Sequence, residues 1–300
     1  MDKIKLGFNC NCFTNRYDEP EEWTAICRDL GIHHVMFNID LIDPYWPWEV
    51  QKKLLDRTLE ACAKNDIKIN ASFGGQHGHQ HYLGHFDPDV RKEAENFFRR
   101  AIRQSAYLGA KSFGTCFAIQ TVRTHSDPAL RKEIMDSAVD SYHRLAEYAA
   151  EVGLPALAYE MTSIERETCA TFAENDEVLA RCSDMAVPMR ICLDMGHRNR
   201  EGLPEEADHL AWIRRYGKDC DVIDCQQSAL ESSGHWPFTE ENNKKGIIDG
   251  AEVVQAIKDS GNTDVLLAFE LRCAAFYPQE KSFLKNLEAS VSYWRNYVKL

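Results

Sequence analysis

The chain has 300 residues and a formal net charge of −12, with 44% hydrophobic and 27% charged residues. This acidity opposes binding to a polyanion such as DNA, which usually depends on a basic face, so we expect no nucleic-acid partner. No apolar run approaches the roughly 20 residues that cross a bilayer, and the N-terminus shows no secretory signal, so we expect a cytoplasmic protein without membrane contact.

Short apolar runs alternate with longer amphipathic segments along the chain. The apolar runs have the length and composition of buried strands, and they comprise residues 4–9, 33–40, 67–73, 111–118, 155–161, 190–195, 221–227 and 264–271. The segments between them carry apolar residues at helical spacing, most clearly over 20–31, 47–66, 90–109 and 130–153. Three of these segments run into a glycine, where the end of a helix favours a left-handed residue: Gly31, Gly109 and Gly153.

This alternation amounts to eight strand–helix units, and no Ser-, Pro- or Gly-rich linker divides them. Eight such units in roughly 250 or more residues match an α/β fold, the (β/α)8 TIM barrel. We therefore predict a single barrel domain over residues 1–300, with a doubly wound sheet as the alternative. A TIM barrel carries its chemistry at the carboxyl ends of its strands, so the residues that end the strands are candidates for a site.

Oxygen-bearing side chains end four successive predicted strands. Any one of them can be explained by a strand that simply meets water at its end. Four in succession form an oxygen-rich set suited to Mn²⁺ or Mg²⁺, with Co²⁺ or Zn²⁺ as less favoured alternatives. We therefore predict one divalent metal ion, held by Glu160, Asp194, Gln226 and Glu270.

These strand ends, with the motif LDMGH at 193–197, resemble the xylose isomerase-like TIM barrels, which include ketose 3-epimerases and sugar-phosphate isomerases. The resemblance covers nearly the whole chain. It implies that Asp194 binds metal while His197 contacts the sugar. Gln226 departs from the epimerase pattern, which has a histidine there. An amide oxygen can replace imidazole for a hard cation, so we expect the site to persist with less preference for zinc.

The predicted chemistry is proton abstraction next to the carbonyl of a ketose. A metal bound to the carbonyl and adjacent hydroxyl oxygens would stabilise the charge of an enediolate. Glu160 and Glu270 could act as base and acid on opposite faces and invert the carbon, as the resemblance implies, or one could move a proton between carbons and isomerise. Either glutamate could also be a ligand alone. We expect a short ketose or ketose phosphate as substrate. In the segments CFTNR, SIERE, CQQ and GHWPF the chain resembles a branch of bacterial sugar-phosphate enzymes that act on short ketoses, and this resemblance implies a tetrulose phosphate.

Three further segments contain candidate substrate contacts. The glycine-rich stretch 74–85 contains His77, His79, His81 and His85, and we interpret it as a loop that closes over substrate through His85, with a second metal site as the alternative. Arg166 could bind a substrate oxygen or phosphate through its bidentate fork, or it could be a surface arginine. His235 follows strand seven and could help close the pocket, or pack in its loop.

The eleven cysteines are an odd number and often lie inside apolar runs, for example Cys62, Cys116, Cys192 and Cys225. We interpret them as small buried residues in a reducing compartment.

Other function classes on the same barrel remain alternatives. An apurinic-site endonuclease-like phosphodiesterase would need a histidine-rich three-metal zinc centre and a DNA-binding face, which the net acidity and Gln226 disfavour. A metal-dependent dehydratase is a chemical neighbour. A non-catalytic barrel that binds metal or sugar is disfavoured by the two glutamates. A homo-oligomer is left open.

Overall fold

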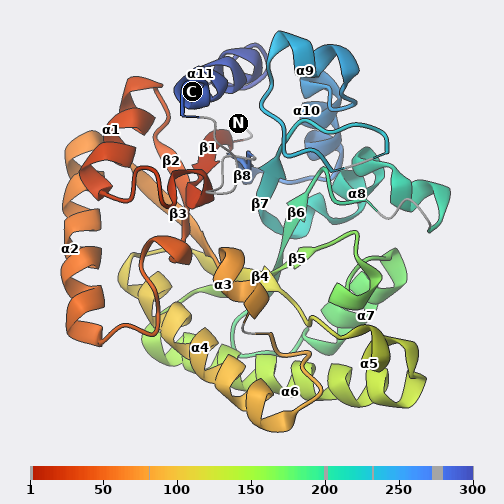
Figure 1. The fold of residues 1–300 in the computed structure, drawn as a ribbon. Coiled ribbons are helices and arrows are strands. Elements are labelled where there is room, and N and C mark those ends of the chain that lie inside the picture. The colour runs from red at the N-terminus through yellow and green to blue at the C-terminus, as the bar shows by residue number, and fades with distance from the viewer. Residues whose placement is uncertain (1–2, 81, 199–201, 232, 272–279, 300) are drawn as a thin grey trace.

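The parallel strands of the computed structural model close into a barrel in the order β1 to β8, and helices surround it (Figure 1). The structure describes residues 3–80, 82–198, 202–231, 233–271 and 280–299. Every predicted apolar run overlaps one strand. The pairing of β1 with β8, which closes the sheet, confirms the (β/α)8 barrel over the doubly wound alternative. The strands are β1 (Lys3–Asn9), β2 (His34–Asn38), β3 (Lys68–Phe73), β4 (Ser112–Cys116), β5 (Ala156–Met161), β6 (Met189–Asp194), β7 (Cys220–Cys225) and β8 (Asp264–Phe269).

The four long amphipathic segments form the helices that the spacing predicts. Where these helices end, Gly31, Gly109 and Gly153 have positive φ angles of 65°, 73° and 83°, as predicted. The helices are α1 (Pro20–Asp29), α2 (Trp48–Asn65), α3 (Gly75–Gln80), α4 (Pro88–Tyr107), α5 (Val122–Ser126), α6 (Pro128–Val152), α7 (Phe172–Arg181), α8 (His209–Tyr216), α9 (Glu240–Lys245), α10 (Gly250–Asp259) and α11 (Phe283–Trp294). Short 3-10 helices add η1 (Cys10–Phe13), η2 (Ile39–Leu41), η3 (Glu165–Glu167), η4 (Pro204–Ala207) and η5 (Gly217–Asp219).

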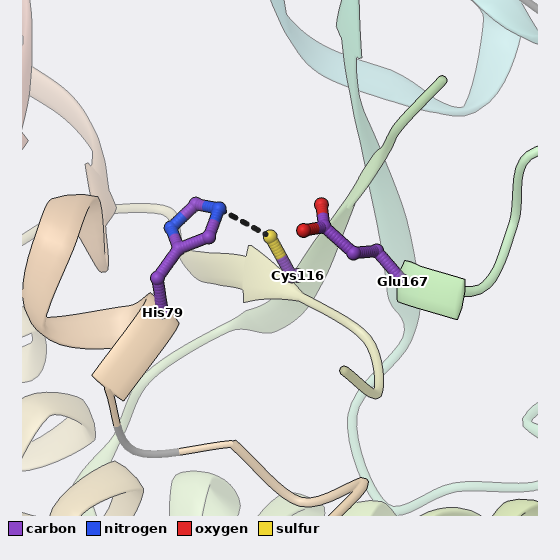
Figure 2. A group of neighbouring side chains, drawn as sticks. All are labelled: His79, Cys116 and Glu167. Atoms are coloured by element: carbon purple, nitrogen blue, oxygen red, sulfur yellow. Dashed lines mark hydrogen bonds between the residues drawn. The ribbon is translucent and has the colours of Figure 1, made fainter. Parts of the chain in front are cut away.

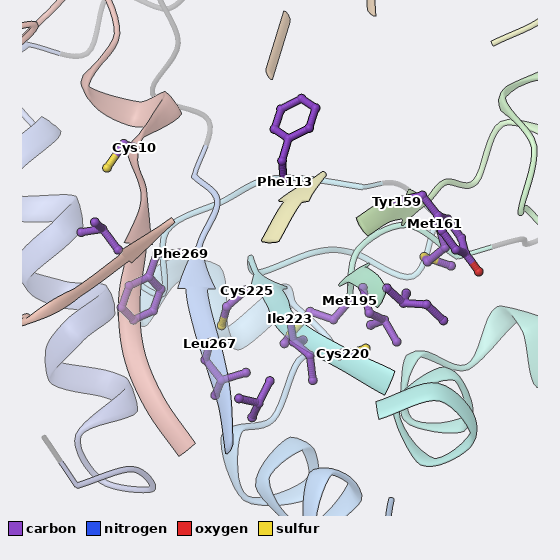
Figure 3. Packing of buried hydrophobic residues seen from close by; sticks show 14 of the residues in the cluster. Cys10, Phe113, Tyr159, Met161, Met195, Cys220, Ile223, Cys225, Leu267 and Phe269 are labelled. Carbon is purple, nitrogen blue, oxygen red and sulfur yellow. The ribbon is translucent and has the colours of Figure 1, made fainter. Parts of the chain in front are cut away.

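The strands contribute to two separate cores because successive side chains point to opposite faces. Leu267 and Phe269 of β8 belong to the large cluster between the strands and the surrounding helices (Figure 3). Leu266 and Ala268 belong to a second cluster, formed by strand residues alone inside the barrel. The same alternation carries the next residue, Glu270, to the inner face. The period of two therefore decides which strand-end residues face the centre of the barrel.

The predicted loop at 74–85 is partly wrong, because residues 75–80 form the helix α3. Its glycines serve close packing: a Cβ on Gly78 would lie 2.3 Å from Thr115 Oγ1 of β4. Gly78 therefore lets α3 lie directly against the barrel. His81 and the side chain of His77 lie outside the described part of the structure.

The cysteines of the described ranges are buried and free of disulfides, as the packing interpretation predicts. Cys273 lies outside these ranges. Among the helices that the structure describes, none combines the length and apolar character needed to span a bilayer.

Candidate active site

The four side chains that end β5 to β8 lie together at the carboxyl rim of the barrel. Glu160 lies within β5, Asp194 ends β6, and Gln226 and Glu270 directly follow β7 and β8. The first three residues are at most 4% exposed, and the side chain of Glu270 is 15% exposed. Their strands thus bring three carboxylates and an amide into a largely buried group.

The DMGH turn after β6 is built around the carboxylate of Asp194. Its Oδ1 accepts hydrogen bonds from the backbone N–H groups of Gly196 and His197, at 2.5 and 3.1 Å. Gln226 Nε2 donates to Oδ1 and Oδ2 at 2.8 and 2.7 Å. A Cβ on Gly196 would lie 2.4 Å from Gln226 Cδ, so glycine is required for this close approach. The spacing of the motif therefore reflects a turn in which the Asp194 carboxylate accepts the backbone N–H groups two and three residues later.

Two histidines complete the group. His197 Nδ1 lies 3.1 Å from Glu160 Oε1, and His235 Nδ1 lies 3.5 Å from Glu270 Oε2. Their ring centroids are 5.3 Å apart. The structure therefore brings both of these predicted substrate contacts to the glutamates.

Gln226 presents its nitrogen, and not its oxygen, to Asp194. Its Oε1 accepts the backbone N–H of His235 and the hydroxyls of Ser228 and Ser233, the latter two at 2.9 and 3.1 Å. A backbone N–H can only donate, so this contact assigns the orientation of the amide. The predicted metal ligation through Oε1 would therefore require the amide to turn over.

Burial and mutual repulsion shape the charges of this group. Burial, followed by the charges of Asp194 and Glu160, raises the pKa of Asp224 well above its ordinary value. Burial and the neighbouring carboxylates, Asp224 first among them, also raise the pKa of Glu270. Burial disfavours the charged form of His197, but Asp194 and Glu160 outweigh it and raise the pKa to about 10. A charged His197 and the weaker tendency of Asp224 and Glu270 to ionise thus both limit the negative charge of this group.

These residues fit a divalent cation. Glu160, Asp224 and Glu270 each place one carboxylate oxygen within 4.8 Å of the other two, and Asp194, His197 and His235 form a second such group. Among the described residues, the buried atoms Asp224 Oδ1 and Glu270 Oε2 have no hydrogen-bond partner. Buried acceptors without partners are costly, so a cation bound by Glu270 would satisfy that oxygen directly and offset the charge of the neighbouring Asp224.

His85 and Arg166, the two other predicted substrate contacts, interact with residues outside the carboxylate group. His85 Nδ1 accepts the backbone N–H of Asp87 at 3.1 Å, and its ring stacks on Phe86. Arg166, in η3, has a side chain that is 39% exposed and lies 3.8 Å from the carboxylate of Glu167. The structure describes neither residue in contact with the carboxylates of β5 to β8.

Asp224 and Asn11 escaped the sequence analysis. Asp224 is fully buried and precedes Gln226 by two positions in β7, so strand alternation could have found it. Asn11 follows β1 and donates its Nδ2 to Glu270 Oε1 at 3.0 Å. Its signal was weak because a lone asparagine after a strand is common in turns.

Comparison with known proteins decides the family. The sequence model of the xylose isomerase-like TIM barrel matches residues 13–294. The chain belongs to this family.

The relatives of this family member include epimerases. It is 30% identical over 299 residues to D-erythrulose 1-phosphate 3-epimerase of Brucella abortus (strain 2308), covering 98% of the chain and 96% of the relative. A candidate xylose isomerase of Rhodospirillum rubrum has a similar fold, with a TM-score of 0.90, 24% identity, and coverage of 98% and 99% of the two chains. D-psicose 3-epimerase of Clostridium cellulolyticum H10 follows with a TM-score of 0.73, 16% identity and coverage of 99% and 100%. The relative from Brucella abortus supports the predicted assignment to the isomerase class of enzymes. The two solved structures support the fold alone.

Proposed function

We propose that this family member is a divalent-metal-dependent 3-epimerase of a short ketose phosphate, with a tetrulose phosphate as the favoured substrate. The observation that carries the proposal is the pair Glu160 and Glu270, which reach one buried group from β5 and β8. A 3-epimerase removes a proton from one face of a carbon and returns one to the other, so it needs two proton carriers. The relative from Brucella abortus, which bears the name of such an epimerase, supports this reaction and substrate class.

The proposed cation is Mn²⁺ or Mg²⁺, because the donors are mostly hard oxygen atoms. When bound, it supplies positive charge that stabilises the anion formed next to the ketose carbonyl. Gln226 would join the ligands once its amide turns over. The proposed ligands are Glu160, Asp194, Gln226 and Glu270.

In the proposed mechanism, Glu160 and Glu270 hold and move the protons. One carboxylate removes the proton from the carbon beside the carbonyl, and the other returns a proton to the opposite face. His197 lies 3.1 Å from Glu160 and Asn11 donates to Glu270, so both carboxylates are held in fixed orientations. His197 and His235, at the same rim, are the proposed contacts to substrate oxygens.

Arg166 and His85 are proposed as outer contacts to the substrate or its phosphate. The exposed guanidinium of Arg166 has the planar fork that suits phosphate oxygens. His85 would have to exchange its bond with Asp87 for a substrate contact. Their role therefore depends on rearrangement around the bound substrate.

The test is turnover in D₂O with D- and L-tetrulose phosphates and the unphosphorylated ketoses. Protein stripped by a chelator should be inactive and should recover with Mn²⁺ or Mg²⁺. The inverted product should carry solvent deuterium at C3, because the carboxyl group that delivers the new proton has exchanged with D₂O, while the abstracted proton stays on the other carboxylate. Full activity of metal-free protein would contradict the metal assignment. Aldose formation without inversion would replace the epimerase proposal by aldose–ketose isomerisation.

A further inference from the structure

Three side chains of mixed chemistry converge beside the carboxylates of β5 to β8. His79 comes from α3, Cys116 ends β4, and Glu167 ends η3, with the imidazole and the carboxylate approaching the sulfur from opposite sides (Figure 2). His79 Nε2 lies 3.5 Å from Cys116 Sγ. One ligand atom from each residue lies within 4.8 Å of the other two. Three elements far apart in sequence thus place a nitrogen, a sulfur and an oxygen atom around one point.

The imidazole of His79 is oriented as a metal-binding histidine is. Its Nδ1 lies 3.2 Å from the backbone oxygen of Gly75, and only a protonated Nδ1 can donate to that acceptor. The tautomer assigned by this bond leaves the lone pair of Nε2 directed at Cys116. Metal-ligating histidines commonly donate their other N–H to a backbone carbonyl in this way.

A thiol–imidazole hydrogen bond alone does not account for this arrangement. It would satisfy His79 and Cys116, but it leaves the carboxyl group of Glu167, whose residue is only 6% exposed, facing the sulfur. The guanidinium of Arg166 lies 3.8 Å from this carboxylate, beyond hydrogen-bond distance, so a metal ion between the sulfur and the carboxylate would compensate the buried charge more directly.

We propose that His79, Cys116 and Glu167 bind a second divalent ion of the zinc class. Thiolate, imidazole and carboxylate are the donors that zinc takes in proteins, at about 2.0 to 2.3 Å. Tetrahedral ligands at such bond lengths lie about 3.3 to 3.8 Å apart, which the imidazole and the sulfur already satisfy. On binding, the thiol loses its proton to solvent and the sulfur bonds the metal.

The second site is open and adjoins the first. The exposed position of His79 leaves a fourth coordination position to water, as in zinc sites with three protein ligands. Cys116 and Glu160 are register partners in β4 and β5. The second ion would therefore lie next to a proposed catalytic glutamate, within reach of the same substrate.

Cobalt tests the proposal through a signal that the first site cannot give. The holoprotein is stripped and titrated with Co²⁺, and absorption is recorded in the near ultraviolet, where a thiolate bound to cobalt gives a charge-transfer band. We expect this band in the natural protein and its loss in Cys116→Ser. His79→Ala should weaken cobalt binding at this site by at least about tenfold. Because His79 is exposed, this variant also serves if Cys116→Ser does not fold.

Two matched variants separate the sites. Asp194→Asn, which disables the proposed first site, should keep the thiolate band, and so should Cys62→Ser, which removes a buried thiol in α2. Metal analysis should find two ions in the natural protein and one in either Cys116→Ser or Asp194→Asn. A natural protein without the band at saturating Co²⁺, or a band that survives Cys116→Ser, would overturn the second site while leaving the epimerase proposal untouched.

Discussion

Gln226 is engaged at both ends of its amide, and this determines which atom it offers to the carboxylates. Three donors occupy its oxygen, and its nitrogen bonds Asp194. A metal ion at the first site would compete with those donors for the oxygen. The identity of this one side chain should therefore influence which metal the protein prefers.

Replacement of Gln226 by histidine tests this influence. An imidazole nitrogen is a softer donor than an amide oxygen, and it needs no amide to turn over. We expect Gln226→His to retain metal binding and to shift the preference from Mn²⁺ or Mg²⁺ toward Zn²⁺ or Co²⁺. Competition titrations followed by metal analysis would measure the shift. An unchanged order of preference would place Gln226 outside the ligand shell.

Conservative substitution can separate the proton-transfer role of Glu160 and Glu270 from their role as metal ligands. Glu160→Gln and Glu270→Gln keep side-chain size and can retain an amide oxygen for the metal, but they remove the proton carrier. General acid–base groups contribute about 10² to 10⁴ in rate, so kcat should fall at least that far in each variant. Glu165→Gln, in the exposed part of the loop after β5, is the matched control and should keep its turnover. Near-normal turnover of both site variants with metal bound would make the glutamates ligands alone.

At the scale of elements, the packing of α3 against β4 requires a residue without a side chain at position 78. The Cβ contact of 2.3 Å expected at position 78 would involve Thr115, which is buried in β4. An added methyl group must push α3 outward, and His79 would move with it. Packing of one short helix is thus coupled to the position of a proposed metal ligand.

Gly78→Ala should therefore destabilise the protein, by about 1 to 3 kcal/mol as is typical of overpacking. Urea unfolding gives the change in free energy. Thr115→Ala removes the atom that clashes, so the double variant should recover part of the loss, and a double-mutant cycle measures the recovery. Gln80→Ala, on the exposed side of α3, should change stability by no more than about 0.5 kcal/mol. If the Gly78 and Thr115 effects simply add, the close contact is not the cause.

The sequence predicted the strands well and α3 poorly, for different physical reasons. Buried parallel strands are short apolar runs, so β5 to β8 and the residues that end them could be located from composition alone. In α3, the glycines of residues 74–85 indicated a flexible loop, whereas Gly78 serves close packing against Thr115. Such a requirement arises from a neighbouring strand and leaves no local signal.

At the scale of the whole molecule, acid stability should depend partly on His209 at the start of α8. Burial lowers its pKa from an ordinary 6.5 to about 4, with Arg198 and Arg214 adding to the effect and Asp208 opposing it. Between those pH values the unfolded chain holds a proton that the folded chain excludes. The stability tied to this group is therefore complete above pH 6.5 and is lost as the pH falls toward 4.

At pH 5 this loss should amount to about 2 kcal/mol. His209→Met keeps an apolar side chain of similar size and removes the titration, so its unfolding free energy should fall less between pH 7 and pH 5. Urea unfolding of both proteins at the two pH values measures the difference. An equal loss of unfolding free energy in the two proteins between pH 7 and pH 5 would show that His209 does not control stability over this pH range.

The candidate site as a whole was only partly accessible from sequence. Period-two alternation places Glu160, Asp194, Gln226 and Glu270 on one inner face, and this could be anticipated. The approach of His79 to Cys116, and of Asn11 to Glu270, joins elements that are distant along the chain. Contacts of this kind follow from how the barrel closes, which composition and periodicity do not specify.

The closing seam of the barrel has a consequence for how the protein is made. β1 pairs with β8 from Lys3↔Asp264 to Phe8↔Phe269, so the strand that leaves the ribosome first acquires its second neighbour last. At about 5 to 20 residues per second, translation of the intervening chain takes on the order of ten seconds or more. Throughout that time one edge of β1 can pair with other nascent chains, and a charged lysine is a common protection of such an edge. Lys5 provides this charge on β1 during synthesis. After the barrel closes, its ammonium group forms an ion pair with Asp264 of β8.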